Sequence, residues 1–223
     1  MKLSFTAHAA PPPSFPGQPH PAVVIPHPDK TALRMRLRGL RRRLAHELPH
    51  AAERAAARLP IERLPPFHAF SLYQPMGSEL DPRPLLARLR HRGARAALPA
   101  TRGPAEVMTF RLWEPHVRLE PDGHGIPAPP PFAPEIEPDL VVTPLLGFDR
   151  AGRRLGQGAG HYDRALAGLR ARKPVYVIGL AYAGQEIAEL PHEDHDERLD
   201  AILTEAEYIE VDQSLSGGRP AAD

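Results

Sequence analysis

The stretch HAFSLYQPMGSELDPRPLLARLRHRGARAAL, residues 68–98, decides the fold. It opens with His68–Tyr73, a short and mostly apolar run typical of a buried strand. The Asp81–Pro82 pair then indicates the start of a helix, and Gly93 indicates its end. Ala94–Leu98 is a second short apolar run. Two strands joined by a helix in this way predict parallel pairing with a right-handed crossover.

A helical pattern precedes this unit. Leucines recur at spacings of three and four from Leu33 to Leu48, which predicts an amphipathic helix. Asp29 is expected to cap its start, and Pro49 is expected to end it. A second helix is expected over Ala51–Arg58, before the next proline.

Further apolar runs on the C-terminal side extend the alternation. Strands are predicted at 107–112, 140–143, 175–180 and 208–211, with a helix at 162–169 and a proline- and glycine-rich excursion at 114–138. Strands that alternate with helices predict one α/β domain of the three-layer, Rossmann-like class, in which helices flank a mostly parallel sheet. The domain is expected to span residues 29–212. A proline-rich, disordered arm is expected at 1–28 and a flexible tail at 213–223.

The composition excludes several kinds of chemistry. There is no cysteine, so disulfides, thiolate zinc sites and cysteine nucleophiles are excluded, and the chain fits the cytoplasm. The 28 basic residues nearly balance the 27 acidic ones, so no field of one sign favours nucleic acid or an anionic membrane surface. No apolar run approaches the roughly 20 residues of a membrane span. We expect small-molecule partners, with no nucleic acid and no membrane, and a monomer or weak dimer.

The most informative segment for function is RRLGQGAGHYDR, residues 153–164, between a predicted strand and a predicted helix. Its glycines alternate at Gly156, Gly158 and Gly160. Such glycines let backbone N–H groups surround an anion in front of a helix N-terminus. The segment is neither a Walker A loop nor the dinucleotide fingerprint G-x-G-x-x-G, because position 161 is histidine. Ordinary turn chemistry also accounts for glycines in a loop.

The charged neighbours of these glycines favour phosphate binding. Arg153 and Arg154 precede them, and Asp163 lies in the first turn of the predicted helix. A carboxylate beside a phosphate cradle suits Mg²⁺, which prefers hard oxygen ligands shared with nucleotide phosphates.

The string RLGQGAGHYDR at 154–164 resembles the R-L-G-x-G-x-G-x-Y-D-R signature of the 5-formyltetrahydrofolate cyclo-ligases. Three further segments resemble motifs of that family in the same order: KTALR at 30–34, SELDP at 78–82 and LPHEDHDERLD at 190–200. The resemblance runs from about residue 30 to residue 210. It implies an enzyme that uses ATP and Mg²⁺ to convert 5-formyltetrahydrofolate to 5,10-methenyltetrahydrofolate. In that reaction ATP phosphorylates the formyl oxygen, N10 attacks the activated carbon, and phosphate leaves.

The resemblance implies nucleotide contacts from two segments. Lys30 and Arg34, four residues apart on one side of the first helix, would reach the ATP phosphates. A solvated basic face is the alternative, because further arginines, among them Arg41, crowd the same helix. The other implied ATP-binding residues are Arg154, Gly156, Gln157, Gly158, Ala159, Gly160, His161 and Tyr162.

The resemblance also implies metal and folate contacts. Asp163 and Asp200 would serve Mg²⁺, although Asp200 alone also fits an ordinary surface carboxylate. Gln74, Met76 and Glu79 would line the folate pocket. We hypothesise that Glu79 accepts two parallel hydrogen bonds from the N–H and amino groups of the pterin edge. Its alternative is a helix-start carboxylate favoured by the helix dipole.

The chain departs from the family pattern at three positions. Ala159 stands where the family often has glycine, His161 replaces the usual aromatic residue, and Ala128 replaces a frequent acidic residue. His161 keeps open a non-catalytic folate- or nucleotide-binding module. A sugar-phosphate isomerase or a CoA transferase is a second alternative for such an α/β domain. The histidines and aspartates of 192–196 are interpreted as a polar loop near the site, because their spacing matches no zinc arrangement.

Overall fold

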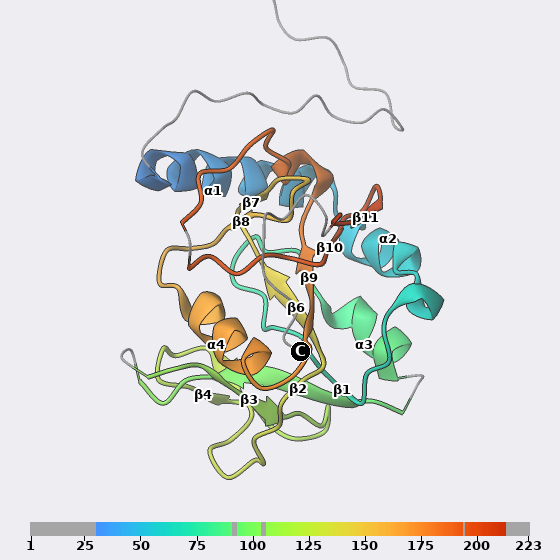
Figure 1. The fold of residues 1–223 in the computed structure, drawn as a ribbon, viewed down its shortest axis with the longest axis vertical. Helices are drawn as coiled ribbons and strands as arrows, with labels where there is room; N and C mark the ends of the chain where they lie inside the picture. The colour runs from blue at the N-terminus through green and yellow to red at the C-terminus, as the bar shows by residue number, and fades with distance from the viewer. Residues whose placement is uncertain (1–29, 91–92, 104–105, 194, 213–223) are drawn as a thin grey trace, which may run out of the picture.

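The computed structural model describes residues 30–90, 93–103, 106–193 and 195–212 (Figure 1). The predicted arm at 1–28, the predicted N-cap Asp29 and the predicted tail at 213–223 lie outside the described residues. Within those ranges the helices are α1 (Lys30–Glu47), α2 (Ala51–Arg58), α3 (Arg83–Arg90) and α4 (His161–Arg170), with 3₁₀ turns η1 (Ile61–Arg63) and η2 (Ala183–Gln185). None of the helices in this part of the chain combines the length and apolarity that a bilayer crossing requires.

Seven strands form the main sheet, in the order β11-β10-β9-β6-β1-β2-β3. Their bounds are β1 (Ala69–Ser71), β2 (Arg95–Ala100), β3 (Thr109–Leu112), β6 (Leu140–Pro144), β9 (Tyr176–Leu180), β10 (Ala201–Leu203) and β11 (Tyr208–Glu210). The five inner strands pair in parallel, whereas the edge strands β3 and β11 are antiparallel to their neighbours. The three-layer, mostly parallel α/β class predicted from the sequence is confirmed, including the parallel β1–α3–β2 unit.

The leucine pattern of the first helix becomes the inner face of α1. Leu33, Leu37 and Leu44 are buried. Leu33 and Leu37 pack on the short hairpin of β7 (Gly147–Phe148) and β8 (Arg154–Leu155), which follows β6. The helix ends two residues before Pro49, whose ring cannot continue the backbone hydrogen bonding.

Helices cover both faces of the sheet. Leu85 and Leu89 of α3 belong to the core on one face, together with the alanines of α2. Leu166 and Leu169 of α4 belong to the core on the other face. Figure 1 shows α4 and the α2–α3 pair on opposite sides of the strands, with α1 crossing one end of the sheet. The connections that leave β1 and β6 therefore diverge to opposite faces, which is where sheets of this class open a crevice.

The sequence patterns do not predict several short strands. β10 has three residues, and the β7–β8 hairpin has two in each strand. A second small hairpin, β4 (Glu120–Pro121) with β5 (Pro127–Ala128), lies in the proline-rich excursion. Strands of two or three residues offer too few positions for a periodic signal, and pairing with neighbours decides them.

Candidate active site

A cavity of about 580 Å³ opens at the carboxyl ends of the central strands. Tyr73 and Gln74 line it from the loop after β1, Thr101 lines it after β2, and Pro144 and Leu145 line it at the end of β6. This is the point at which the connections of β1 and β6 diverge, the usual ligand site of such sheets. All the site residues predicted from the sequence line the cavity except Asp200.

The first helix contributes two cations to the cavity. Lys30 lies with its Nζ 2.5 Å from Glu193 Oε1 and 3.6 Å from Asp196 Oδ2. Arg34 donates from Nε to the carbonyl oxygen of Gly156 at 3.1 Å. Both side chains therefore connect α1 to loops that are distant in the sequence, which a solvated basic face would not do.

The glycine-rich segment lies between β8 and α4, as the sequence predicts. Gly158 has φ +113°, and a β-carbon added there would lie 3.3 Å from Cζ of Arg34. Gly160 has φ +64° and immediately precedes the first residue of α4. Both positions use backbone conformations that disfavour a side chain. The backbone of this loop consequently lies directly against Arg34, at the N-terminus of a helix, where anions are favoured.

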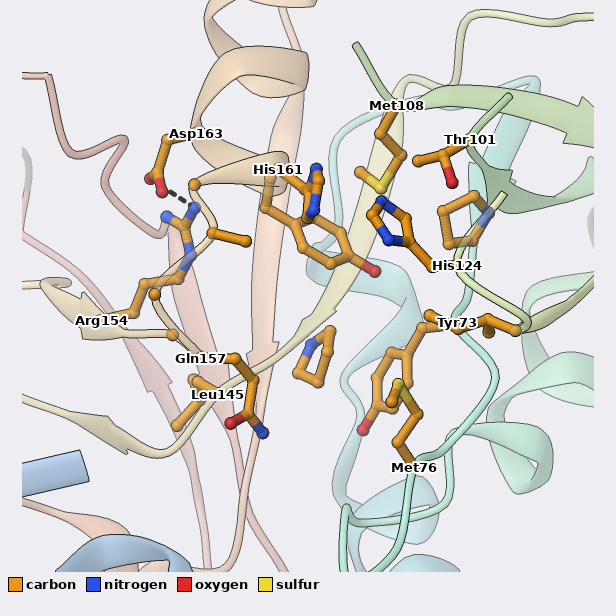
Figure 2. Close-up of a pocket in the computed structure, with 18 of the residues that line it drawn as sticks. Tyr73, Met76, Thr101, Met108, His124, Leu145, Arg154, Gln157, His161 and Asp163 are labelled. Atoms are coloured by element: carbon orange, nitrogen blue, oxygen red, sulfur yellow. Dashed lines mark hydrogen bonds and ion pairs between the residues drawn. The ribbon is translucent and has the colours of Figure 1, made fainter. Parts of the chain in front are cut away.

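Asp163 lies on the first turn of α4 beside Arg154 (Figure 2). Its Oδ1 accepts a hydrogen bond from Nη2 of Arg154 at 2.6 Å and one from the N–H of Glu197 at 3.1 Å. The Arg154 side chain is 5% exposed and that of Asp163 is 23% exposed. Arg154 also donates to the carbonyl oxygen of Glu197. These contacts fix the carboxylate at the cavity and attach the loop around Glu197 to it.

Asp200 is the predicted site residue that does not line the cavity. Its Oδ2 accepts hydrogen bonds from Arg170 at 2.7 Å and from the N–H of Val177 at 2.7 Å. These contacts tie the start of β10 to β9 and α4. Asp196, four residues earlier in the same motif, does line the cavity. The sequence interpretation left Asp196 in a polar loop near the site, because the spacing of residues 192–196 matches no zinc arrangement.

The carboxylates of the cavity fit Mg²⁺ only in part. No three His, Cys, Asp or Glu side chains in the described ranges are grouped to hold a metal by themselves. Mg²⁺ commonly takes one or two carboxylates and completes its coordination with phosphate oxygens and water. Asp163 and Asp196 supply two carboxylates in one cavity with the glycine-rich loop, which fits that pattern.

Glu79 lies in the loop that follows β1, at the other side of the cavity. Its side chain is 5% exposed. Oε1 accepts from Nη1 of Arg41 at 3.3 Å, and Oε2 accepts from the N–H of Met76 at 3.0 Å. Met76 and Gln74 line the same part of the cavity. Glu79 precedes α3 by only a few residues, yet its partners belong to α1 and its own loop, not to the helix N-terminus.

Two phenols stand near Glu79, the buried Tyr73 and the partly buried Tyr162. Burial, and then the Glu79 charge, raise the pKa of Tyr73 well above its ordinary value. Burial and the Glu79 charge likewise raise the pKa of Tyr162, partly opposed by Arg154. Both hydroxyls therefore stay protonated at neutral pH, and they add neutral polar groups to the wall around the carboxylate.

A pair of histidines forms a further part of the wall. The rings of His124 and His161 lie 4.7 Å apart, edge to face, and Figure 2 shows them beside Met108 and Thr101. Burial, then the neighbouring His124 and Arg164, lower the pKa of His161, which favours the neutral ring. His124, Thr101 and Met108 come from segments that sequence reasoning assigned no role. No short motif predicts these three residues, because the β2–β3 turn and the proline-rich excursion bring them to the cavity only in the folded chain.

Comparisons with known proteins agree with the motifs. The sequence profile of the 5-formyltetrahydrofolate cyclo-ligase family matches residues 26–205. A 5-formyltetrahydrofolate cyclo-ligase of Mycolicibacterium smegmatis is 34% identical over 139 residues, which cover 59% of this chain and 71% of that protein. The Escherichia coli K12 protein of the same name is 31% identical over 148 residues, covering 64% of this chain and 81% of that protein.

Solved structures are similar over a larger part of the chain. The 5,10-methenyltetrahydrofolate synthetase of Aquifex aeolicus superposes with a TM-score of 0.66 at 25% identity, over 87% of this chain and 96% of that one. The synthetase of Mycoplasma pneumoniae superposes with a TM-score of 0.62 at 25% identity, over 79% of this chain and 99% of that one.

Proposed function

Since the chain belongs to the 5-formyltetrahydrofolate cyclo-ligase family, we propose how the residues of its cavity carry out that family's reaction. The enzyme converts 5-formyltetrahydrofolate to 5,10-methenyltetrahydrofolate with consumption of ATP and release of ADP and phosphate. One observation supports the assignment of residues. One cavity gathers the α1 cations, the glycine-rich loop with Asp163, and the buried Glu79 from three separate segments.

The chemical difficulty is the formyl oxygen, which is amide-like and leaves poorly. Transfer of the γ-phosphoryl group of ATP to this oxygen makes it a phosphate leaving group. N10 then attacks the formyl carbon and gives up its proton to solvent or to the departing phosphate, and cleavage of the carbon–oxygen bond releases phosphate and leaves the methenyl bridge. Such a reaction asks the protein mainly to position two substrates and to stabilise negative charge.

The nucleotide is assigned to the side of the cavity formed by α1 and the glycine-rich loop. Lys30, Arg34 and Arg154 supply positive charge for the phosphates. The loop from 156 to 160 supplies backbone N–H groups at the start of α4, with Gln157, Ala159 and His161 along its rim. Tyr162 lies behind it.

We assign Mg²⁺ to Asp163 and Asp196, in place of the Asp163 and Asp200 pair expected from the sequence. When bound there, Mg²⁺ neutralises charge on the phosphate oxygens during transfer. The protein's own part is to hold Asp163 through Arg154 and the N–H of Glu197. Lys30 lies near Asp196 and Glu193, so it can exchange these carboxylates for phosphate oxygens.

The folate is assigned to the side of the cavity formed by Glu79, Gln74 and Met76. An ionised carboxylate accepts the two parallel hydrogen bonds that a pterin edge offers, which fixes the ring. The neutral phenols of Tyr73 and Tyr162 and the thioether side chain of Met108 also line the cavity. A fixed ring places the formyl oxygen toward the nucleotide side.

The test is the appearance of the methenyl product, followed by its near-ultraviolet absorbance with 5-formyltetrahydrofolate as substrate. Product is expected only when ATP and Mg²⁺ are both present. Omission of either component is the control. A folded protein that binds ATP but forms no product under these conditions contradicts the assignment and favours a non-catalytic binding module.

A further inference from the structure

Arg41 is a charged residue in the middle of α1 that is only 6% exposed. Arginine is rarely so buried unless it is paired. Its Nη1 lies 3.3 Å from Glu79 Oε1 and 3.4 Å from the carbonyl oxygen of Leu145, and its Nε lies 3.2 Å from Ser78 Oγ. One side chain therefore connects α1 to the loop after β1 and to the chain just after β6, the two segments between which the cavity opens.

The buried Glu79 side chain is stabilised by such a partner. Taking a carboxylate that is 5% exposed out of water carries a large desolvation penalty, which a paired cation offsets. A carboxylate has about four acceptor positions. Arg41 occupies a position on Oε1 and the N–H of Met76 occupies one on Oε2, so each oxygen keeps acceptor capacity for a ligand.

The other titratable groups near Glu79 cannot supply the countercharge. Tyr73 and Tyr162 are phenols whose pKa values are raised, so they are neutral, and Asp81, which also acts on Tyr73, is an acidic residue. Arg154, which acts on Tyr162, is already paired with Asp163. The ion pair that the described residues give Glu79 is the one with Arg41.

Position along the helix explains why Arg41 points inward. Lys30, Arg34, Leu37, Arg41 and Leu44 follow one another at spacings of four, three, four and three, which places them on one face of a helix. The sequence interpretation counted Arg41 among the arginines of a solvated face. Its place in the leucine pattern, between two buried leucines, instead corresponds to the core.

We propose that Arg41 is a positioning residue for the folate, acting through Glu79. The guanidinium pairs with the Glu79 carboxylate and holds it in one orientation, while Arg41 itself does not line the cavity. The inference rests on the proposed function, in which Glu79 binds the pterin edge. It adds that α1 acts on both substrates. Lys30 and Arg34 in its first turns reach the nucleotide, and Arg41 in its middle positions the carboxylate that binds the folate.

The experiment compares the kinetic constants of Arg41→Met, Arg41→Lys and Arg42→Met with those of the wild type, for each substrate in turn. Arg41→Met is expected to raise KM for 5-formyltetrahydrofolate by about tenfold or more, the scale of one charge-assisted hydrogen bond, and to change KM for ATP by less than about twofold. Arg41→Lys is expected to recover part of the loss because it restores the charge. Arg42 is exposed on the same helix, so Arg42→Met is the matched control.

The comparison of the two substrates separates positioning from simple packing. A purely structural defect impairs the use of both substrates, whereas loss of a folate-positioning residue raises KM for the folate and leaves KM for ATP nearly unchanged. An unchanged folate KM in a folded Arg41→Met enzyme would overturn the proposal.

A double substitution covers the case in which Arg41→Met does not fold. Arg41→Met with Glu79→Gln removes both buried charges together, which buried pairs tolerate better than the loss of one partner. If Arg41 acts through Glu79, this double variant is no more impaired than Glu79→Gln alone. Additive losses overturn the proposal. A normal folate KM in Glu79→Gln overturns it as well, whereas the reaction itself is judged separately by the wild-type assay.

Discussion

We assign the nucleotide to the wall of the cavity formed by Lys30, Arg34 and residues 154–163, the nucleotide wall, and the folate to the wall formed by Tyr73 and Glu79, the folate wall. On the nucleotide wall, charges are shared among several partners and some of them are accessible: the Lys30 side chain is 24% exposed and contacts two carboxylates. On the folate wall, one carboxylate is 5% exposed and has one cationic partner, Arg41. The same helix, α1, supplies cations to both walls.

This difference has a physical reason in the two ligands. A nucleotide arrives with several negative charges and a metal, so side chains that exchange one carboxylate for another adapt to it. A flat pterin edge presents fixed donors, and a carboxylate held rigid before binding avoids an ordering cost. Loss of a single cation from the nucleotide wall should therefore lower activity only modestly. Loss of the Asp163 carboxylate on that wall, or of Glu79 on the folate wall, should lower activity severely.

Asp163→Asn should have the largest effect. It removes the carboxylate charge assigned to Mg²⁺ while keeping the shape of the side chain that contacts Arg154. We expect kcat to fall by about 10²- to 10³-fold, the scale of losing one electrostatic contact to a reacting group. Steady-state turnover measured across a range of Mg²⁺ concentrations checks this.

The matched control is Asp200→Asn, the same substitution at the other predicted metal ligand. Asp200 pairs with Arg170 and the N–H of Val177, so this variant should lose about 1–3 kcal/mol of stability but keep its Mg²⁺ dependence. Near-normal turnover in Asp163→Asn, or a changed Mg²⁺ requirement in Asp200→Asn, would contradict the proposed assignment.

Glu79→Gln should come next, because it tests the folate wall alone. The amide keeps one acceptor oxygen but replaces the other with a donor, so it cannot accept two parallel hydrogen bonds. We expect kcat/KM for 5-formyltetrahydrofolate to fall by about 10- to 100-fold, with KM for ATP nearly unchanged. Initial rates with each substrate varied in turn check this. Equal changes in both KM values would mean that the two walls are not independent.

Local signals predicted most of the fold. The leucine spacing of α1, the boundaries around Pro49, and the strand–helix–strand unit at 68–98 all depend on neighbours in the chain, and each is confirmed. β10 is different. Its three residues become a strand because β9 and β11 lie on either side of it, and this pairing is a tertiary property.

The site residues also divide into those that local motifs predict and those that only the folded chain brings to the cavity. Lys30, the alternating glycines and Asp163 lie in motifs whose spacing carries their chemistry, and the structure gathers them in one cavity. His124 and Asp196 enter the cavity through the path of their loops, which no short pattern encodes. Arg41 was indistinguishable from the exposed arginines beside it by residue type. Only its place between Leu37 and Leu44 marks it as buried.

Gly158→Ala tests whether the nucleotide wall depends on backbone shape as well as on charge. The residue has φ +113°, and an added β-carbon would lie 3.3 Å from Cζ of Arg34, so both the loop and Arg34 must shift. We expect KM for ATP to rise by about tenfold, since a strained residue of this kind costs about 1–3 kcal/mol. Initial rates at varied ATP concentration provide the measurement.

Gly168→Ala is the control for Gly158→Ala. Gly168 lies within α4 and outside the cavity, and a β-carbon there makes only ordinary contact with Arg172 at 3.7 Å. Its KM for ATP should stay at the wild-type value. If Gly158→Ala binds ATP as tightly as Gly168→Ala does, the close approach of the loop to Arg34 has no role in nucleotide binding.

Lys30→Ala should give the smallest loss, because Lys30 shares its task with Arg34 and Arg154. We expect KM for ATP to rise by about three- to tenfold with little change in the folate KM, in line with one partly exposed charge. Glu193→Gln should act in the opposite direction. Glu193 Oε1 lies 2.5 Å from Lys30 Nζ, so its carboxylate competes with phosphate for the same cation.

Competition between Glu193 and phosphate for Lys30 predicts that the change in KM for ATP depends on ionic strength. If Lys30 passes from Glu193 to phosphate, Glu193→Gln lowers KM for ATP by about twofold at low ionic strength, and the gain shrinks as salt screens the exposed pair. Glu189→Gln is the matched control, because Glu189 is 81% exposed and lies near Arg153 instead. An unchanged ATP requirement in Lys30→Ala would return Lys30 to the solvated basic face. Nucleotide binding would then depend on the glycine-rich loop and Asp163. The two walls would differ only in how each one holds its carboxylate, Asp163 or Glu79.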